Sequence, residues 1–313
     1  MKSYDIVALG EILIDMTYAG KSEAGQTLFE QNPGGAPANV LAAAARLGAS
    51  TAFIGKVGRD MHGEFLRDIL DREGISTENL IIDDNVFTTL AFVSLDANAN
   101  RTFSFARKPG ADTCLCPDEV NSELVSSAKI FHVGSLSLTD EPAKSATLMA
   151  LETAKRGGAI ITYDPNYRAS LWKSEEIAVE NMRSILPSVD LIKISDEETK
   201  LLTGCASPED AAAELIAAGI SLVIVTLGKD GAYVRTPNGE YRAPAAPTTP
   251  RDTTGAGDAF MGGFLYRLSK SGKRPSELTP DEITDFMQFA NRVAAFCVAR
   301  RGAICAMPRI DQI

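Results

Sequence analysis

The chain has 313 residues, 45% hydrophobic and 23% charged, so it is long enough to bury a substantial core. Its net charge of −10 and pI near 4.9 argue against surfaces for nucleic acids or anionic membranes, because their phosphates would be repelled. Five cysteines without zinc-type spacing, and an N-terminal apolar run too short for a signal peptide, predict a cytoplasmic protein.

Short, nearly continuous apolar runs alternate with helical segments along the chain. The expected strands are 4–10, 51–57, 130–133, 159–163, 191–194 and 222–227. The expected helices are 36–47, 61–73, 141–156, 175–185, 208–218 and 259–269. Continuous apolar runs are typical of strands covered on both faces. The alternation therefore predicts an α/β fold in which a mostly parallel sheet lies between two helical layers.

Two segments, about 12–31 and 86–106, interrupt this alternation. They contain strand-like pieces with no helix between them, including a hairpin around a turn at 96–100. We expect them to form a small β-sheet lid, and its exposed strand edges predict a homodimer that pairs through the lid. Since no long linker or internal repeat is present, residues 1–313 are expected to form a single domain.

Several polar residues follow expected strands, where ligands of open α/β sheets bind. They are Asp15, the pair Gly34 and Gly35, Asn39, and Asn166. Carboxylate acceptors, amides that donate and accept, and close backbone approach suit a neutral substrate rich in hydroxyl groups. Taken singly, each residue also has a structural interpretation, as a capping aspartate, a helix-start asparagine or a turn glycine.

Residues 252–258 combine two glycines with a carboxylate directly before an expected helix. Gly255 and Gly257 allow the backbone to approach a ligand closely. The N–H groups of Ala256, Gly257 and Asp258 would face an anion at a helix start, and Asp258 would accept a proton from an attacking alcohol. This pattern predicts phosphoryl transfer to a hydroxyl group. The alternative is a simple turn in which Asp258 only stabilises the helix dipole.

Other classes of nucleotide-binding protein fit the sequence poorly. A nicotinamide dehydrogenase would show G-x-G-x-x-G after the first strand, but Gly10 is followed by Glu11 and two apolar residues. No G-x-x-x-x-G-K-[ST] phosphate loop occurs. A non-catalytic sugar-binding regulator remains an alternative, although the glycines and Asp258 are both present.

Six ordered motifs resemble the ribokinase-like sugar kinases, the phosphofructokinase-B family, and within it the fructokinases most of all. The motifs span 10–15, 32–39, 55–63, 164–168 with 171–172, 226–231 and 252–258. The resemblance covers essentially the whole chain. It implies the ribokinase-like three-layer fold, an adenine nucleotide as phosphoryl donor, and the hydroxymethyl group of a sugar as acceptor.

On the acceptor side, the resemblance implies that Asp15, Gly35 and Asn39 hold sugar hydroxyls. It places three lid phenylalanines near the substrate, namely Phe92, Phe103 and Phe105, although packing inside the lid is an equal alternative. Arg107 would steady a phosphate or sugar oxygen, or else be an exposed cation. Arg168 would contact the substrate without distinguishing a fructokinase from a 2-keto-3-deoxygluconate kinase.

On the donor side, the resemblance implies a set of residues along an ATP channel, namely Lys193, Ser195, Thr226, Gly228, Gly231 and Asn291. A solvent-facing helix position is the alternative for Asn291. Glu198 would organise Mg²⁺ through water, but Ser195 stands where the family has asparagine. Carbonyl groups near Asp252, Thr254 and Gly302 would form a K⁺ site.

The sequence therefore predicts transfer of the γ-phosphoryl group of MgATP to the primary hydroxyl of a ketohexose, with fructose as the expected acceptor. Asp258 is the expected base, and the N–H groups of residues 256–258 would stabilise the transferring charge. The alternatives within the class are 2-keto-3-deoxygluconate and an aminoimidazole riboside. Acceptor choice depends on lid contacts that a single sequence does not place.

Overall fold

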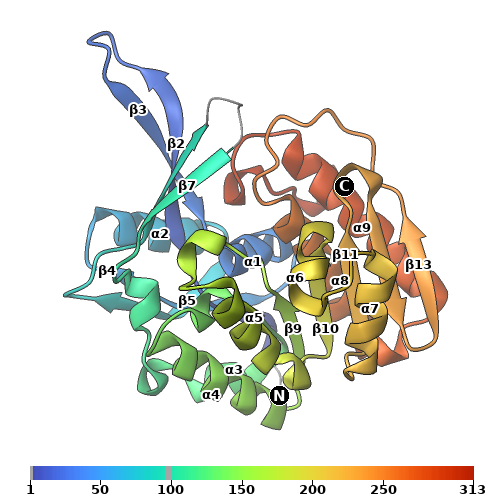
Figure 1. Ribbon diagram of the computed structural model, residues 1–313. Helices are drawn as coiled ribbons and strands as arrows, with labels where there is room; N and C mark the ends of the chain where they lie inside the picture. Colours follow the sequence, from blue (N-terminus) through green and yellow to red (C-terminus); the bar gives the residue numbers. More distant parts are fainter. Residues whose placement is uncertain (1–2, 96–100) are drawn as a thin grey trace.

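The computed structural model describes residues 3–95 and 101–313, and over these residues it confirms the expected three-layer α/β/α arrangement (Figure 1). A nine-stranded sheet is the middle layer. A separate four-stranded sheet, the lid, rises from one side of this body. No helix in these two ranges is both long and apolar enough to cross a membrane.

The large sheet is parallel except at one edge. Its strands are β1 (Tyr4–Leu9), β4 (Thr51–Gly58), β5 (Ile75–Asp83), β8 (Ala128–Gly134), β9 (Ile160–Asp164), β10 (Leu191–Ser195), β11 (Leu222–Thr226), β12 (Ala232–Thr236) and β13 (Gly239–Ala243). They are ordered β13-β12-β11-β10-β9-β8-β1-β4-β5, and only β12 and β13 are antiparallel to their neighbours. The six expected strands are all present, whereas β5, β12 and β13 were not predicted because their polar residues interrupt the apolar runs.

Helices cover both faces of the large sheet. One layer consists of α1 (Ala36–Arg46), α2 (Met61–Arg72), α8 (Ala256–Ser271) and α9 (Pro280–Val298). The other consists of α3 (Ser122–Ser127), α4 (Ala143–Arg156), α5 (Glu175–Ser184), α6 (Asp196–Thr203) and α7 (Pro208–Ala217). Alternate residues of β1 enter the two cores: Ile6 and Ala8 pack on the first layer, Val7 and Leu9 on the second. The continuous apolar runs follow from this double burial.

The lid is built from the two segments that interrupt the alternation of strands and helices. Its strands are β2 (Leu13–Lys21), β3 (Thr27–Gly34), β6 (Leu90–Leu95) and β7 (Arg101–Ala106), in the order β3-β2-β6-β7. The expected turn at 96–100 falls outside the described residues. Because β2 begins four residues after β1 ends, the lid is attached to the large sheet at the carboxyl end of β1.

The connections also set where a ligand can bind. From β1 the chain continues to β4 on one side, while β8 lies on the other side of β1. The helix α1 that leads to β4 and the helix α4 that follows β8 cover opposite faces. Loops that leave β1 and β8 in opposite directions open a crevice at the carboxyl ends of these strands.

Candidate active site

A cavity of about 580 Å³ lies at the carboxyl ends of the parallel strands, beneath the lid. Its walls include segments that directly follow the large-sheet strands, with Glu11 after β1, Leu136 after β8 and Asn166 after β9. The lid contributes Asp15 from β2 and Phe105 from β7. The cavity therefore joins the two sheets, as expected for a lid that covers bound substrate.

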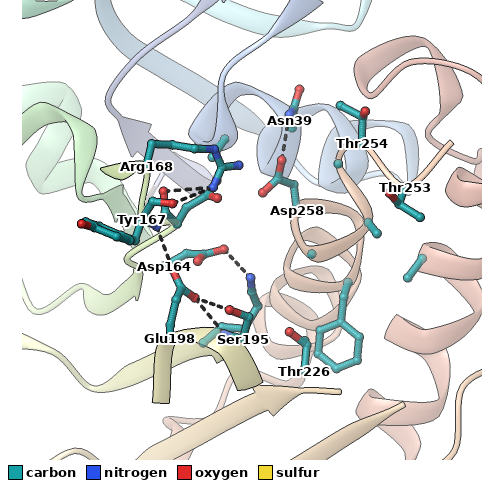
Figure 2. Close-up of a pocket in the computed structure, with 18 of the residues that line it drawn as sticks. Asn39, Asp164, Tyr167, Arg168, Ser195, Glu198, Thr226, Thr253, Thr254 and Asp258 are labelled. Atoms are coloured by element: carbon teal, nitrogen blue, oxygen red, sulfur yellow. Dashed lines mark hydrogen bonds and ion pairs between the residues drawn. The ribbon is translucent and has the colours of Figure 1, made fainter. Parts of the chain in front are cut away.

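The glycine turn before α8 forms one wall of the cavity (Figure 2). The helix begins at Ala256, three residues earlier than expected, so Gly257 and Asp258 lie in its first turn. Gly255 precedes it with φ 75°, and a Cβ there would lie 2.8 Å from the Cβ of Ala303. Ala256 N–H donates to the Thr253 carbonyl at 3.3 Å. First-turn N–H groups have no partner inside their own helix, so this wall suits an anion.

Asp258 lies in the cavity wall with a side chain held by Asn39 (Figure 2). The amide Nδ2 of Asn39 donates to Oδ2 of Asp258 at 2.7 Å, joining α1 to α8. Burial raises the pKa of Asp258 to about 6, and Asp164 adds to the rise, while Lys193 and the Asn39 hydrogen bond oppose it. Above this pH the carboxylate is ionised and is able to accept a proton, as a general base requires.

A buried ion pair lies next to the helix start. Lys193 Nζ is 2.7 Å from Oδ2 of Asp164, and both side chains are almost fully buried. A Cβ on Gly257 would lie 2.9 Å from Lys193 Nζ, so the absence of a side chain lets the ammonium group approach the first turn of α8. Burial lowers the pKa of Lys193, but Asp164, Glu198 and Asp258 outweigh this effect and leave the pKa above its usual value. The cavity of this acidic protein thus contains a fixed positive charge.

Glu198 also lines the cavity, and protein donors hold both of its oxygens. Its Oε1 accepts from Tyr167 N–H at 2.7 Å, and its Oε2 accepts from the N–H and the hydroxyl of Ser195 (Figure 2). Ser195 is the residue that caps α6. The hydroxyl of Ser195, where the resemblance implied an asparagine, therefore helps to fix the orientation of this carboxylate.

Most of the residues predicted for the acceptor line the cavity, namely Asp15, Gly35, Asn39, Phe105, Asn166 and Arg168. Asn166 has φ 46°, an uncommon backbone for a residue other than glycine, directly after β9. Arg168 donates to the Tyr167 carbonyl at 3.0 Å. Oδ1 of Asn39 is buried and has no hydrogen-bond partner among the described residues.

Arg107, Phe92 and Gly34 correct the prediction, because none of them belongs to the cavity wall. Arg107 is 8% exposed and pairs with Asp112, so it is neither an exposed cation nor a direct ligand. The Phe92 ring packs edge-on against Phe29 at 5.6 Å within the lid. Gly34 ends β3, where a Cβ would clash with Asp15 Oδ2. The side chain of Phe103 lies outside the described part of the chain.

The residues predicted for the nucleotide all lie along the cavity, namely Lys193, Ser195, Thr226, Gly228, Gly231 and Asn291. Gly231 has φ 94°, and a Cβ there would clash with the Ala243 carbonyl. Asn291 is 6% exposed, which rules out the solvent-facing alternative. Its amide donates to the carbonyl of Pro244 at 2.9 Å and so anchors the connection after β13.

The three residues predicted for a monovalent cation are neighbours. Asp252 Oδ1 accepts from the N–H of Thr254 at 2.9 Å, and its Oδ2 accepts from the N–H of Gly302 at 3.1 Å. Asp252 thereby ties the glycine turn to the segment after α9. Thr254 lines the cavity, whereas Asp252 and Gly302 are not part of its wall.

Two acidic residues of the site have no role predicted from the sequence. In the sequence, Asp164 belongs to the motif 164–168 that follows an expected strand. Glu11 belongs to the motif 10–15 and is the residue that breaks a dinucleotide fingerprint, but neither was given a function. Both lie in the cavity wall at the carboxyl ends of β9 and β1. Their position directly after a buried strand is the signal that could have found them, because ligands of parallel sheets bind there.

With this geometry established, comparisons with known proteins place the chain among sugar kinases. A family model described as "pfkB family carbohydrate kinase" matches residues 3–310. A relative from Arabidopsis thaliana, "Probable fructokinase-5", is 43% identical over 308 residues, which cover 97% of this chain and 94% of that protein.

Two solved structures have the same fold over nearly their whole length. A fructokinase with bound ATP from Xylella fastidiosa superimposes with a TM-score of 0.91 and 33% identity, covering 100% of this chain and 97% of that one. A fructokinase double mutant from Vibrio cholerae O395, in its form with fructose, ADP and potassium ion, gives a TM-score of 0.87 and 32% identity. That match covers 99% of this chain and 97% of the other.

Proposed function

Because the chain belongs to the pfkB family of carbohydrate kinases, we propose that it phosphorylates fructose at its primary 6-hydroxyl with ATP as donor. The observation that carries the proposal is the buried Asp258 at the first turn of α8, held by Asn39 in the wall of the cavity. The similarity to fructokinases over almost the whole chain supports fructose as the acceptor.

In the proposed reaction, one group of the site accepts a proton and others stabilise the transferring charge. Asp258 takes the proton of the 6-hydroxyl as the hydroxyl oxygen forms its bond to the γ-phosphorus. The bond between that phosphorus and the bridging oxygen breaks, and ADP leaves with the electron pair. The N–H groups of Gly257 and Asp258, with Lys193 beside them, stabilise the transferring negative charge. Closure of the lid excludes water, which would otherwise accept the phosphoryl group.

The donor is proposed to enter as its Mg²⁺ complex. Within the described residues no group of three or more His, Cys, Asp and Glu side chains is arranged to hold a metal ion. Mg²⁺ at kinase sites is commonly held by one or two carboxylates and by the phosphates of the nucleotide. Glu198 and Asp164 supply carboxylates of this kind in the cavity wall, so the donor set fits. A Mg²⁺ ion held there would neutralise phosphate charge.

Asp15 is proposed to bind sugar hydroxyls from the lid side of the cavity. We expect Asp15→Ala to raise the KM for fructose by about 10- to 100-fold, because a hydrogen bond to a charged acceptor is lost. The KM for ATP should change by less than about twofold. Initial rates at varied fructose and varied ATP test this expectation, and an equal change in both constants would contradict it.

The rate should depend on pH through Asp258. Since burial raises the pKa of this carboxyl to about 6, it is ionised at neutral pH and becomes protonated below that value. A protonated Asp258 cannot accept the hydroxyl proton, so kcat should fall about tenfold per pH unit on the acid side of pH 6. A pH profile at saturating substrates measures this, and a flat profile down to pH 5 argues against Asp258 as the base.

The activity itself is tested by sugar-dependent ADP release. The purified protein should release ADP from MgATP rapidly with fructose and slowly without sugar, whereas a non-catalytic sugar-binding regulator would show no difference. A panel that also contains 2-keto-3-deoxygluconate and an aminoimidazole riboside compares kcat/KM among acceptors. A higher kcat/KM for either of these would replace fructose as the assigned substrate.

Four further properties are proposed for the same protein. Asp252, Thr254 and Gly302 are proposed to frame a K⁺ site, supported by their mutual contacts and by the potassium-bound form of the Vibrio cholerae fructokinase. Exposed Tyr18 and Phe29 on the lid support a homodimer formed through this sheet. All five cysteines are free, which supports a reducing, cytoplasmic location. The whole chain is proposed to act as one kinase domain.

A further inference from the structure

The segment after β1 and the start of α1 are in direct backbone contact. A Cβ on Gly10 would lie 2.6 Å from Cγ of Pro37, and a Cβ on Gly35 would clash with the carbonyl oxygen of Glu11. Gly35 has φ 110°, which other residues rarely adopt. A side chain at either glycine would push the segments apart, so the start of α1 is packed directly against the segment after β1.

Glu11 closes this contact with its side chain. Its Oε1 accepts from the N–H of Ala36, the first residue of α1, at 2.9 Å. The residue that precedes the helix is Gly35, which has no side chain to cap it, so Glu11 supplies the acceptor from a neighbouring loop. Glu11 is 3% exposed, and its Oε2 finds no hydrogen-bond partner among the described residues.

The surroundings of Glu11 disfavour its charged form. Burial raises the pKa of this carboxyl to about 7, against the lowering effect of hydrogen bonds from its own N–H and that of Ala36; the Asp112 carboxylate adds to the rise and Arg107 opposes it. Arg107 is itself paired with Asp112, and it donates to the Leu136 carbonyl, so its charge is largely balanced elsewhere. A neutral carboxyl still accepts the Ala36 hydrogen bond through its carbonyl oxygen.

The helix that Glu11 caps carries the partner of the base. The N–H of Asn39 donates to the Gly35 carbonyl at 2.9 Å in the first turn of α1, and its side chain donates to Asp258. Further along, α1 and α8 touch closely, since a Cβ on Gly262 would lie 2.5 Å from the Cβ of Ala43. A displaced α1 start would therefore move Asn39 relative to Asp258, while the rest of the helix stays packed.

We propose that Glu11 is a positioning residue: it fixes the start of α1 and so holds the Asn39 amide on Asp258. The burial of its side chain, and an Oε2 without a hydrogen-bond partner in the described part of the chain, favour the uncharged form in this role. The catalytic meaning of this proposal rests on the proposed sugar-kinase function. It predicts that the effect of Glu11 is transmitted through Asn39 and does not arise from contact with the substrate. Three properties then separate this role from a purely structural one: kcat, the acid limb of the pH profile, and the pH dependence of stability.

The kinetic test compares Glu11→Ala with Glu11→Gln. Alanine removes the acceptor of the Ala36 N–H, so kcat should fall about 10- to 100-fold, as expected for a misplaced catalytic group. Because the Asn39 hydrogen bond lowers the pKa of Asp258, its loss should move the acid limb upward by about half a pH unit or more. Glutamine keeps the shape and the acceptor, and should keep kcat within about threefold and the limb in place.

Each alternative outcome overturns the proposal. If Glu11→Gln is as slow as Glu11→Ala, the carboxyl proton or charge is required and the uncharged role is wrong. If Glu11→Ala raises only the KM for fructose and leaves the acid limb unchanged, Glu11 contacts the sugar instead. If Glu11→Ala has the kcat, the KM for fructose and the acid limb of the wild type, the residue does not position the base.

The stability test does not depend on sugar-kinase activity. A raised folded-state pKa means that stability is fully present below the unfolded pKa and is lost as pH rises through about 7. Glu11→Gln cannot ionise, so it should melt within about 1–2 °C of the wild type at pH 5, just above the unfolded pKa of 4.5, and about 3–6 °C higher at pH 8.5. Equal melting temperatures at both pH values would overturn the uncharged form. This comparison also serves if Glu11→Ala does not fold.

Asp60→Asn is the matched control, because Asp60 likewise accepts helix-start N–H groups, those of His62 and Gly63 in α2. Its pKa is lowered, since hydrogen bonds from Thr88 together with those from Gly63 and His62 outweigh its burial, so the charged form is favoured in the fold. Asp60→Asn should therefore be less stable than the wild type at both pH 5 and pH 8.5. A wild type without sugar-dependent ADP release would refute the proposed function and leave this stability comparison intact.

Discussion

Asp258→Asn should lower kcat by about 10²- to 10⁴-fold, the range typical of losing a general base. Asparagine has nearly the same shape and still accepts the hydrogen bond from Asn39, but it does not take a proton from the sugar hydroxyl. The KM values for fructose and ATP should stay within a few-fold of the wild type. Steady-state kinetics with a coupled ADP assay measure the change.

The control for Asp258→Asn is its thermal stability. The carboxylate is buried and its pKa is raised, so its charge costs stability above pH 6, and removing the charge should leave the melting temperature at pH 8 unchanged or higher. A slow variant with an intact melting transition isolates the chemical role. Near-normal turnover in this variant would refute the assignment of Asp258 as the base.

Lys193→Met should lower kcat/KM for ATP by about 10²- to 10³-fold, the loss typical of removing one stabilising donor from a transition state. The ammonium group lies beside the first turn of α8 and is the fixed positive charge described in the cavity wall. Because Lys193 also lowers the pKa of Asp258, the acid limb of the pH profile should move to higher pH. Kinetics at varied ATP and pH test both effects.

Lys193→Met also leaves Asp164 buried without its cation, which should destabilise the fold by about 3–5 kcal/mol. The double variant Lys193→Met, Asp164→Asn removes the uncompensated charge and should recover much of the stability. Its activity should remain low, because the positive charge is still absent. Recovery of activity together with stability would show that Lys193 has only a structural role.

The layered fold was predictable because its central strands are buried on both faces. The run from Leu191 to Ile194 and the run from Leu222 to Val225 contain almost only apolar residues, since helices cover both sides of β10 and β11. The edge strand β5 was not predicted, because the polar Asn79 interrupts its apolar run. In the folded chain Asn79 is buried, and its side chain is hydrogen-bonded to the backbone of Glu119 and Asn121.

The direction of individual side chains was less predictable than the position of the motifs. Asn39 was predicted only as a ligand for a sugar hydroxyl, and the sequence did not indicate that its amide also donates to Asp258, 219 residues away along the chain. Arg107 was expected either to contact a phosphate or sugar oxygen or to be an exposed cation, and it is buried in an ion pair with Asp112. A long, charged side chain can adopt many directions, so the residues packed around it in the fold determine which partner it pairs with.

The order of apolar runs, the glycine turn and the carboxylate in it are properties of local chain chemistry, and they were sufficient to indicate the α/β architecture and phosphoryl transfer to a hydroxyl. Lys193 with Asp164, Asn39 with Asp258, and Glu11 with Ala36 are contacts between segments far apart in the chain, and only folding brings them together. The physical reason is that pKa values and hydrogen-bond partners depend on burial and on distances of a few ångströms. Neither quantity exists until the sheet and its two helical layers have assembled.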